Sequence, residues 1–136
     1  MKRSLLSSTA LLGAVLLSSS AALAHAGDAA KELATAGTHA QLSAASQSKE
    51  VATMHLHHTI NCLVGPHGRG FDAAAGDPCK AMGNGALMDS PKKSDLHAKA
   101  LRALMAARRG IAAKDLSAMH KAASEVTTIV GSGSDM

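Results

Sequence analysis

Apolar positions at helical spacing dominate the last third of the chain. Between Leu116 and Val130 they recur three or four residues apart, the period of one face of an α-helix. A preceding stretch starts from a cap at Ser94 or Asp95, and its apolar positions are Leu96, Ala100, Leu101, Ala103, Leu104 and Ala107. Gly110 follows two arginines, which is typical of a helix C-terminus. The pattern predicts two antiparallel helices that turn near Gly110.

The segment before this pair also predicts helices. A short one covers residues 28–36 and ends at Gly37. Thr38 and the glutamine three residues later then form a capping box, which starts a second helix. Neither Pro nor Gly interrupts this second helix before about Leu63, although the polar stretch at residues 46–49 can bend it. Two N-terminal helices are therefore expected, with Gly37 between them.

A long connection rich in Gly and Pro separates the two halves. It runs from Gly65 to Pro91, and Phe71 is its expected apolar anchor. Cys62 and Cys79 are the only cysteines, and an even count in an exported protein predicts a disulfide. In the chain-entropy model a loop of this size contributes about 3 kcal/mol of stability. The alternative keeps both thiols as soft copper ligands beside His58.

Composition points to the fold class. The chain has one aromatic residue and no long β-rich run, so its core is built mainly from Ala, Leu, Met, Val and Ile. Met105 and Met119 lie at helical spacing in the hairpin and are expected to fill this core. The predicted fold is all-α: a small antiparallel bundle of three or four helices with a long disulfide-stapled loop.

The first residues have the pattern of a signal peptide. Lys2 and Arg3 precede an apolar run from Leu5 to Leu17, and small residues follow. Cleavage after Ala24 or after Ala26 fits the small-x-small rule equally well, and the former would leave an N-terminal histidine able to chelate Cu(II). We expect a signal peptide at residues 1–26, a single domain at residues 27–136 and a periplasmic location. No later segment is apolar enough to predict a membrane span.

Charge and chemistry exclude several classes of function. Removal of Lys2 and Arg3 leaves 12 basic against 10 acidic residues, a net charge of +2, and with a single aromatic residue base stacking is not available. No nucleic-acid partner is expected. The chain also lacks HExxH, CxxCH and any nucleophile paired with a base. We therefore expect a protein that is not an enzyme.

Imidazole and sulfur groups gather in one short helical segment. Met54, His55 and His58 fall with Cys62 within an arc of about 100° on the helix surface. His55 and His58 are three residues apart and can share one ion. His57 points about 100° away from His58, so it faces a different side of the helix although it is close in sequence. Imidazole suits zinc, copper and nickel, and sulfur adds a preference for copper.

Two imidazoles do not complete a metal site, since such sites use three or four ligands. The disulfide would fold His67 back toward the end of the helix, which makes it the expected third ligand. Met54 is the alternative if the ion is Cu(I). The metal-site candidates are thus His55, His58, His67, Met54 and His57. The other helical histidines, His39, His97 and His120, are expected to be solvated.

The C-terminal hairpin resembles a known family. Its Ala-rich helices turn at Arg109-Gly110-Ile111 and carry His120 on the return helix, as in the small His-rich periplasmic metal-binding proteins. The Gly37-Thr38-His39 segment adds to this resemblance. It implies a four-helix bundle that binds metal in the periplasm. Those proteins repeat His along every helix, whereas this chain concentrates it at residues 55–58.

The sequence therefore predicts a periplasmic metal-binding protein that buffers, delivers or confers resistance to copper, zinc or nickel, with copper or zinc as the expected ion. The alternative is a periplasmic helical interaction or structural protein, whose His cluster faces solvent or a protein partner. A metal titration of the mature protein separates the two.

Overall fold

The computed structural model describes residues 27–133, and this part of the chain contains helices and no strands. The helices are α1 (Ala29–Ala45), α2 (Lys49–Val64), the single-turn α3 (Ala86–Asp89), α4 (Asp95–Ala112) and α5 (Leu116–Gly131). The predicted all-α class is confirmed. The predicted signal peptide at residues 1–26, with both of its cleavage sites, lies outside the described residues.

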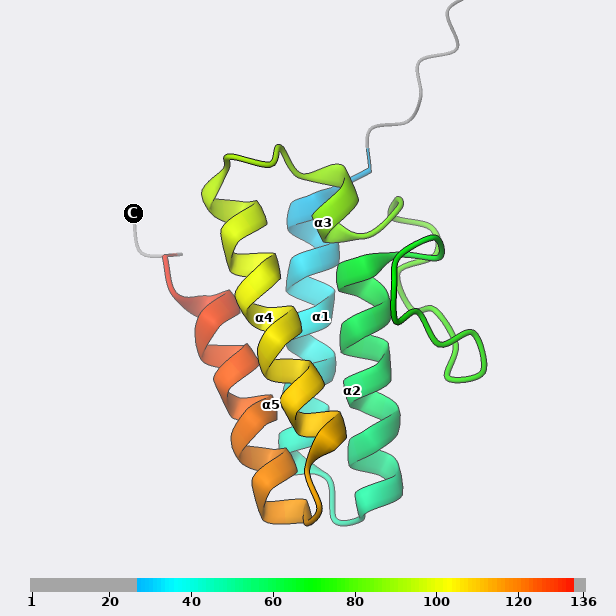
Figure 1. Ribbon diagram of the computed structural model, residues 1–136, viewed down its shortest axis with the longest axis vertical. Coiled ribbons are helices and arrows are strands. Elements are labelled where there is room, and N and C mark those ends of the chain that lie inside the picture. Colours follow the sequence, from blue (N-terminus) through cyan, green and yellow to red (C-terminus); the bar gives the residue numbers. More distant parts are fainter. Residues whose placement is uncertain (1–26, 134–136) are drawn as a thin grey trace, which may run out of the picture.

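The four long helices form an antiparallel bundle (Figure 1). Helix α1 packs against α2 and α5, and α4 packs against the same two helices from the opposite corner. Short turns at residues 46–48 and 113–115 close one end of the bundle. The long connection at residues 65–94, which includes α3, closes the other end. The predicted small helical bundle is confirmed, with four long helices.

Each long helix begins where a polar side chain caps it. Asp28, Ser48, Ser94 and Asp115 precede the four helices, and their side-chain oxygens accept the N–H of the residue three positions later at 2.8–3.2 Å. Such caps satisfy backbone donors that the helix itself leaves free. Of the two caps predicted for α4, Ser94 or Asp95, Ser94 is the one that the structure confirms. Ser48 shows why the polar stretch at residues 46–49 starts a new helix instead of bending an existing one.

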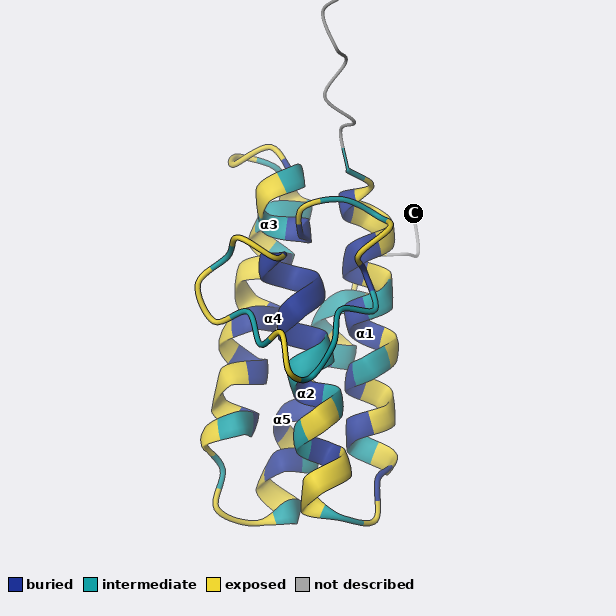
Figure 2. Cartoon of the chain, turned by 90° about the vertical axis from the view of Figure 1, so that its right-hand side faces the viewer, coloured by how far each residue is buried: buried dark blue, intermediate teal, exposed yellow. Residues whose placement is uncertain are grey.

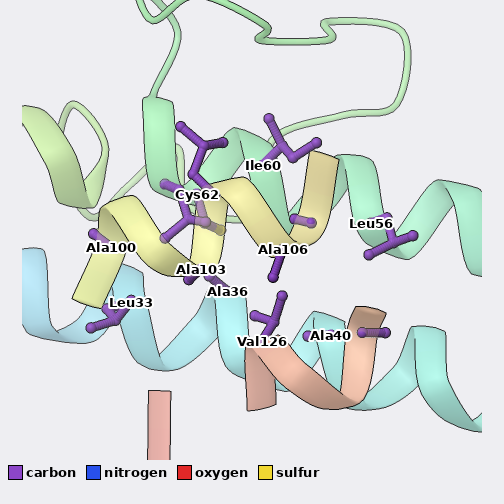
Figure 3. Close-up of a cluster of buried hydrophobic side chains, with 14 of the residues drawn as sticks. Leu33, Ala36, Ala40, Leu56, Ile60, Cys62, Ala100, Ala103, Ala106 and Val126 are labelled. Carbon is purple, nitrogen blue, oxygen red and sulfur yellow. The ribbon is translucent and has the colours of Figure 1, made fainter. Parts of the chain in front are cut away.

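The core lies between the four helices and is built largely from alanine. Buried residues face inward and exposed ones outward along each helix (Figure 2), and the close-up shows the small side chains meeting at the centre (Figure 3). Leu56, Leu63, Met119 and Val126 are the large apolar side chains that are fully buried. Met119 fills the core as predicted, whereas Met105 is 60% exposed and Leu101 is 45% exposed. Those two predicted core positions are wrong because they lie on the outer face of α4.

Two of the glycines that were expected to end helices, Gly37 and Gly110, lie inside them. Gly37 is in the middle of α1, and Gly110 precedes the end of α4 by two residues; neither has a positive φ. Both are buried at close helix contacts, where a Cβ on Gly37 would lie 2.9 Å from Val130 Cγ1 and one on Gly110 would lie 2.7 Å from Leu56 Cδ1. The predicted boundaries at Gly37 and Gly110 are therefore wrong. Glycine serves here to let the helices approach each other.

We expect Gly110→Ala to destabilise the protein although alanine is the better helix former. The substitution gains up to about 1 kcal/mol of helix propensity, but overpacking against Leu56 and Ala122 costs about 1–3 kcal/mol. Urea unfolding should show a net loss of up to about 2 kcal/mol, the cost of overpacking less the gain in helix propensity. Gly131→Ala is the matched control because nothing lies within 4 Å of the added Cβ. Equal stability of the two variants would contradict the close contact.

The long connection is tied to the bundle at several points. Cys62 at the end of α2 and Cys79 in the loop form a disulfide, so the predicted pairing is confirmed and the described residues contain no free thiol. Gly65, with φ 70°, ends α2 as expected and crosses the backbone at Gly85, whose φ is 101°. A side chain on either glycine would overlap the backbone of the other segment. Phe71 packs against the core as the predicted anchor.

Within residues 27–133, no helix is both long and apolar enough to span a lipid bilayer.

Candidate metal centre

Three histidines from two neighbouring helices converge on one point. His39 lies on α1, whereas His55 and His58 lie one turn apart on α2. One ring nitrogen of each lies within 4.8 Å of those of the other two, and all three side chains are half-buried. The ring centroids are 4.8 Å apart for His39 and His58, 5.5 Å for His39 and His55, and 5.7 Å for His55 and His58. This group could hold a transition-metal ion.

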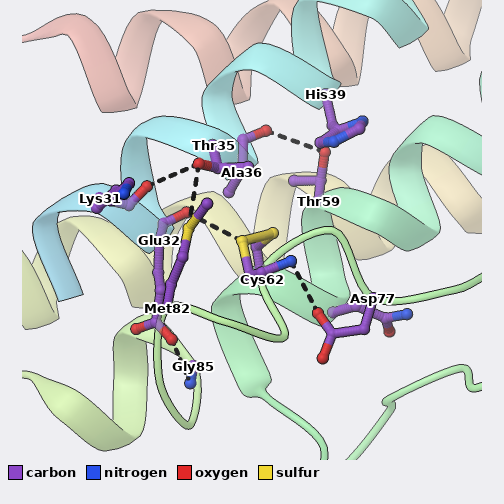
Figure 4. The surroundings of a disulfide bond; sticks show 12 residues. Lys31, Glu32, Thr35, Ala36, His39, Thr59, Cys62, Asp77, Met82 and Gly85 are labelled. Carbon is purple, nitrogen blue, oxygen red and sulfur yellow. Dashed lines mark hydrogen bonds between the residues drawn. A yellow bond between two sulfur atoms is a disulfide. The ribbon is translucent and has the colours of Figure 1, made fainter. Parts of the chain in front are cut away.

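Two buried hydrogen bonds between side chain and backbone fix the position of α1 along α2. Thr59 donates its hydroxyl to the Ala36 carbonyl at 3.1 Å, and Ser43 donates to the Ala52 carbonyl at 2.9 Å. Both hydrogen bonds are buried. They fix α1 against α2 on either side of His39, which therefore faces the turn of α2 that carries the other two imidazoles (Figure 4 shows His39 above Thr59).

The ring nitrogens of His39 and His55 are already at a ligand spacing. Their Nδ1 atoms lie 3.3 Å apart. A tetrahedral zinc ion with Zn–N bonds of 2.0–2.1 Å places neighbouring ligand nitrogens about 3.3 Å apart. An ion bound by both Nδ1 atoms would thus need little movement of these two rings, and His58 would close the third side.

His58 is oriented by its other nitrogen. Its Nε2 lies 2.6 Å from the Ala75 carbonyl oxygen, which can only accept, so Nε2 carries the proton. In the neutral ring the lone pair is then on Nδ1, and this atom is buried without a hydrogen-bond partner. Metal-binding histidines characteristically donate the other ring N–H to a carbonyl or carboxylate, which fixes tautomer and orientation. His58 has this arrangement.

The loop that supplies this carbonyl is held by a buried amide. Asn61 is fully buried on α2, donates to the carbonyls of Asp72 and Gly76 at 2.7 and 2.6 Å, and accepts the Asp72 N–H at 2.8 Å. The Asp72 carboxylate accepts the N–H groups of Ala74 and Ala75 at 3.0 and 3.4 Å. Together with the disulfide that follows Asn61 by one residue, these bonds place the Ala75 carbonyl on His58.

The surroundings favour unprotonated imidazoles. Burial, followed by the nearness of His58 and His55, lowers the pKa of His39 from 6.5 to about 4. Burial and then His58 also lower the pKa of His55. A neutral ring is the form that binds metal, so His39 and His55 are ready to do so at neutral pH.

The structure separates the other sequence-predicted ligands from this group. His57 points toward the loop, where its Nδ1 lies 3.4 Å from the Asp72 carboxylate. His67 is exposed in the connection after α2, and Met54 is 41% exposed on α2. The predicted pair His55 and His58 is thus brought together, but its third imidazole comes from His39 and not from His67.

The three histidines that were expected to be solvated have specific partners. His39 belongs to the cluster. His97 lies 3.0 Å from the Ser90 hydroxyl, and the Nε2 of His120 lies 2.9 Å from the Ser46 carbonyl at the turn between α1 and α2. The last two are half-buried structural contacts between distant segments.

His39 was missed because the helix boundary was misplaced. With Gly37 as a helix end, residue 39 begins the same helix that carries His55, four turns away from it. With the break at residues 46–48, α1 and α2 form a hairpin in which residue 39 faces the segment around residue 56. The serine cap of α2 was the signal that could have placed the break.

No protein-family model, curated protein or solved structure matches this chain. The resemblance to His-rich periplasmic bundles therefore stays a prediction.

Proposed function

We propose that the protein binds one transition-metal ion, zinc or copper, through His39, His55 and His58. The observation that carries this proposal is the orphaned Nδ1 of His58, a buried lone pair beside two further imidazoles, whose own ring is held by the Ala75 carbonyl. A lone pair without a donor partner costs free energy unless something binds it. A cation that accepts it, together with those of His39 and His55, removes this cost.

The donor set supports zinc and copper over magnesium or calcium. All three candidate ligands are imidazoles, which suit zinc, copper and nickel, whereas the harder cations prefer oxygen. Three protein ligands would leave a fourth position for water or for a ligand from a partner. Because the imidazoles are half-buried, an ion can enter and leave from the surface.

The proposed setting is the periplasm, and the proposed role is to hold and hand over the ion rather than to catalyse a reaction. The charged and apolar pattern of residues 2–17 supports export. The disulfide supports an oxidising compartment, in which such bonds persist. A site of three ligands on a small protein fits buffering or delivery of the ion.

We expect a double change of His39 and His58 to Ala to lower the affinity for Zn(II) or Cu(II) by at least about tenfold, or about 1.4 kcal/mol. Isothermal titration calorimetry on the chelator-treated protein at pH 7.5 should give one ion per chain for the wild type. His67→Ala is the matched control because His67 is exposed and outside the cluster.

Two results would overturn this proposal. An equal loss of affinity from His67→Ala would indicate diffuse surface chelation. No binding by the wild type at micromolar metal would favour the helical interaction or structural protein, whose His cluster faces solvent or a protein partner.

A further inference from the structure

Three carboxyl groups meet where α1 begins, and one of their oxygens is buried without a partner. Glu32 is fully buried; its Oε1 accepts the Gly85 N–H at 2.8 Å, and its Oε2 has no hydrogen-bond partner. The charged groups that face it are both acids, Asp89 of α3 and the cap residue Asp28. Figure 4 shows Glu32 reaching from α1 to Gly85. This end of the bundle thus carries a group of carboxyls with one buried oxygen that lacks a hydrogen-bond partner.

Asp89 is held there by neutral donors only. Its carboxylate accepts the backbone N–H of Asn84 at 2.6 Å and the side-chain amide of the same residue at 3.1 Å. Among residues 27–133, a side-chain base lies beside a carboxylate at His57 with Asp72 and at Arg109 with Glu125, and neither Glu32 nor Asp89 has a basic side chain within ion-pair distance. The pKa of Glu32 is accordingly raised to about 7, by burial first and then by Asp89, against the lowering effect of the Gly85 N–H. A cation close to Glu32 and Asp89 would stabilise the charged form of these carboxyl groups.

Gly27 lies against the same group of carboxyls. A Cβ at this position would overlap Asp89 Oδ2 and would lie 2.8 Å from the Cα of Gly83. Since a backbone nitrogen is about 2.5 Å from its own Cβ position, the nitrogen of Gly27 lies within about 4 Å of that oxygen. The next residue is fixed, because the Asp28 N–H donates to the Met82 carbonyl at 2.9 Å. The backbone nitrogen of residue 27 is therefore held beside the Asp89 carboxylate.

One of the two predicted cleavage sites would convert this nitrogen into a cation. Hydrolysis of the Ala26–Gly27 peptide bond adds one water molecule and leaves a carboxylate on Ala26 and an α-ammonium group on Gly27. Cleavage after Ala24 would instead leave the charge two residues away, roughly 7 Å along the chain. An α-amino group has an ordinary pKa of about 7.7–8.0, so it is largely protonated at pH 7.

We propose that the exported protein is cleaved after Ala26 and that the new α-ammonium group of Gly27 docks on the Glu32 and Asp89 carboxylates. The processed N-terminus then supplies the cation that the folded chain lacks. A cation near a helix N-terminus is unfavourable for the helix dipole, whereas the nearby carboxyl groups of Glu32 and Asp89 favour it. The contact also explains why residue 27 is glycine, since any side chain would displace Asp89. Signal cleavage would thus stabilise the fold in the compartment where it is needed.

The first test is the N-terminus itself. The full chain is expressed in a bacterium, and the mass of the exported protein is measured after purification. We expect a protein that begins at Gly27. A protein that begins at His25, or one that keeps residues 1–26, would overturn the proposal.

The second test compares chains that begin at Gly27, Ala26 or His25, released from a cleavable fusion. Each contains all five helices and the whole buried core. In urea at pH 7.5 with chelator, the unfolding equilibrium constant of the Gly27 chain should be at least about fivefold smaller than those of the longer chains. Glu32→Gln, which keeps the bond to Gly85, should remove most of this difference.

An NMR titration of the ¹⁵N-labelled Gly27 α-amine gives a readout that folding stability does not affect. Docking should raise the pKa of this amine, and Glu32→Gln should return it toward its ordinary range. Equal stability of the three chains, or an amine that titrates alike with and without Glu32, would overturn the proposal. Equal stabilisation of all three chains by added Ca²⁺ or Mg²⁺ would also overturn it, because the acids would then be a divalent-cation site.

Discussion

Replacement of both Cys62 and Cys79 by alanine should lower the free energy of unfolding by about 3 kcal/mol. The disulfide closes a loop of 17 residues, for which the loss of denatured-state entropy is worth about that much. Small domains have total stabilities of only about 5–15 kcal/mol, so the effect is large. For a domain of this size the midpoint of thermal unfolding should fall by roughly 10–20 °C. Circular dichroism in urea and on heating, with chelator present, measures both.

The same change should weaken metal binding by about tenfold, since loss of groups that orient a ligand typically costs 10–100-fold in affinity. Without the disulfide, the loop holds the Ala75 carbonyl on His58 only through Asn61 and Asp72. The wild type treated with reductant is the control for stability and should unfold like the variant, whereas its free thiols would themselves be metal ligands, so affinity is compared only between the oxidised wild type and the variant. Unchanged stability in the variant would contradict the entropic role, and unchanged affinity would contradict the coupling of loop to imidazole.

Acidification should destabilise the metal-free protein through His39. Its pKa is lowered to about 4 in the fold, against 6.5 in the ordinary state, so the unfolded chain binds a proton at higher pH than the folded one. The resulting stability is fully present above pH 6.5 and is lost as the pH falls through 4. A shift of this size corresponds to about 2–3 kcal/mol for a half-buried group. His55 adds to the effect in the same direction.

His39→Asn isolates this contribution, because asparagine carries no charge in this range. In a chain that keeps residues before Gly27, Glu32 acts in the opposite direction: its pKa is raised to about 7, so its contribution is present below pH 4.5 and is lost as the pH rises through 7. The two variants Glu32→Gln and His39→Asn should therefore change the pH profile with opposite slopes. Unfolding in urea between pH 4 and 8, with chelator, gives the difference curves. A difference between wild type and His39→Asn that does not vary with pH would contradict the lowered pKa.

The sequence was a good guide wherever a local rule acted alone. The polar cap at Ser94, the helix stop at Gly65 and the apolar face of α5 follow from the conformational and hydrogen-bonding preferences of a few neighbouring residues. The disulfide followed from cysteine count. These features need no knowledge of what packs against them.

Predictions from the sequence were wrong where one residue type can have two structural roles. Glycine ends helices when it adopts positive φ, but it also allows two helices to approach closely, and only the partner helix decides between these uses. Val130 lies against Gly37, and Leu56 lies against Gly110. Because of the misplaced boundary at Gly37, His39 and His55 were assigned to one helix, on which they would be four turns apart. His39 was therefore expected to be solvated, although it lies on α1 and faces α2.

By itself the sequence determined the helical class, the disulfide and the pair of imidazoles on α2, because each depends on residue types at short spacing. The third imidazole, the Ala75 carbonyl that orients His58 and the contact of Gly27 with Asp89 were decided only by the tertiary structure. Each of these contacts joins residues that are distant in the chain. How close such residues lie in space depends on how far one helix is shifted along its axis relative to the next. That shift is fixed by buried hydrogen bonds such as the bond from Thr59 to Ala36, whose partners no local pattern identifies.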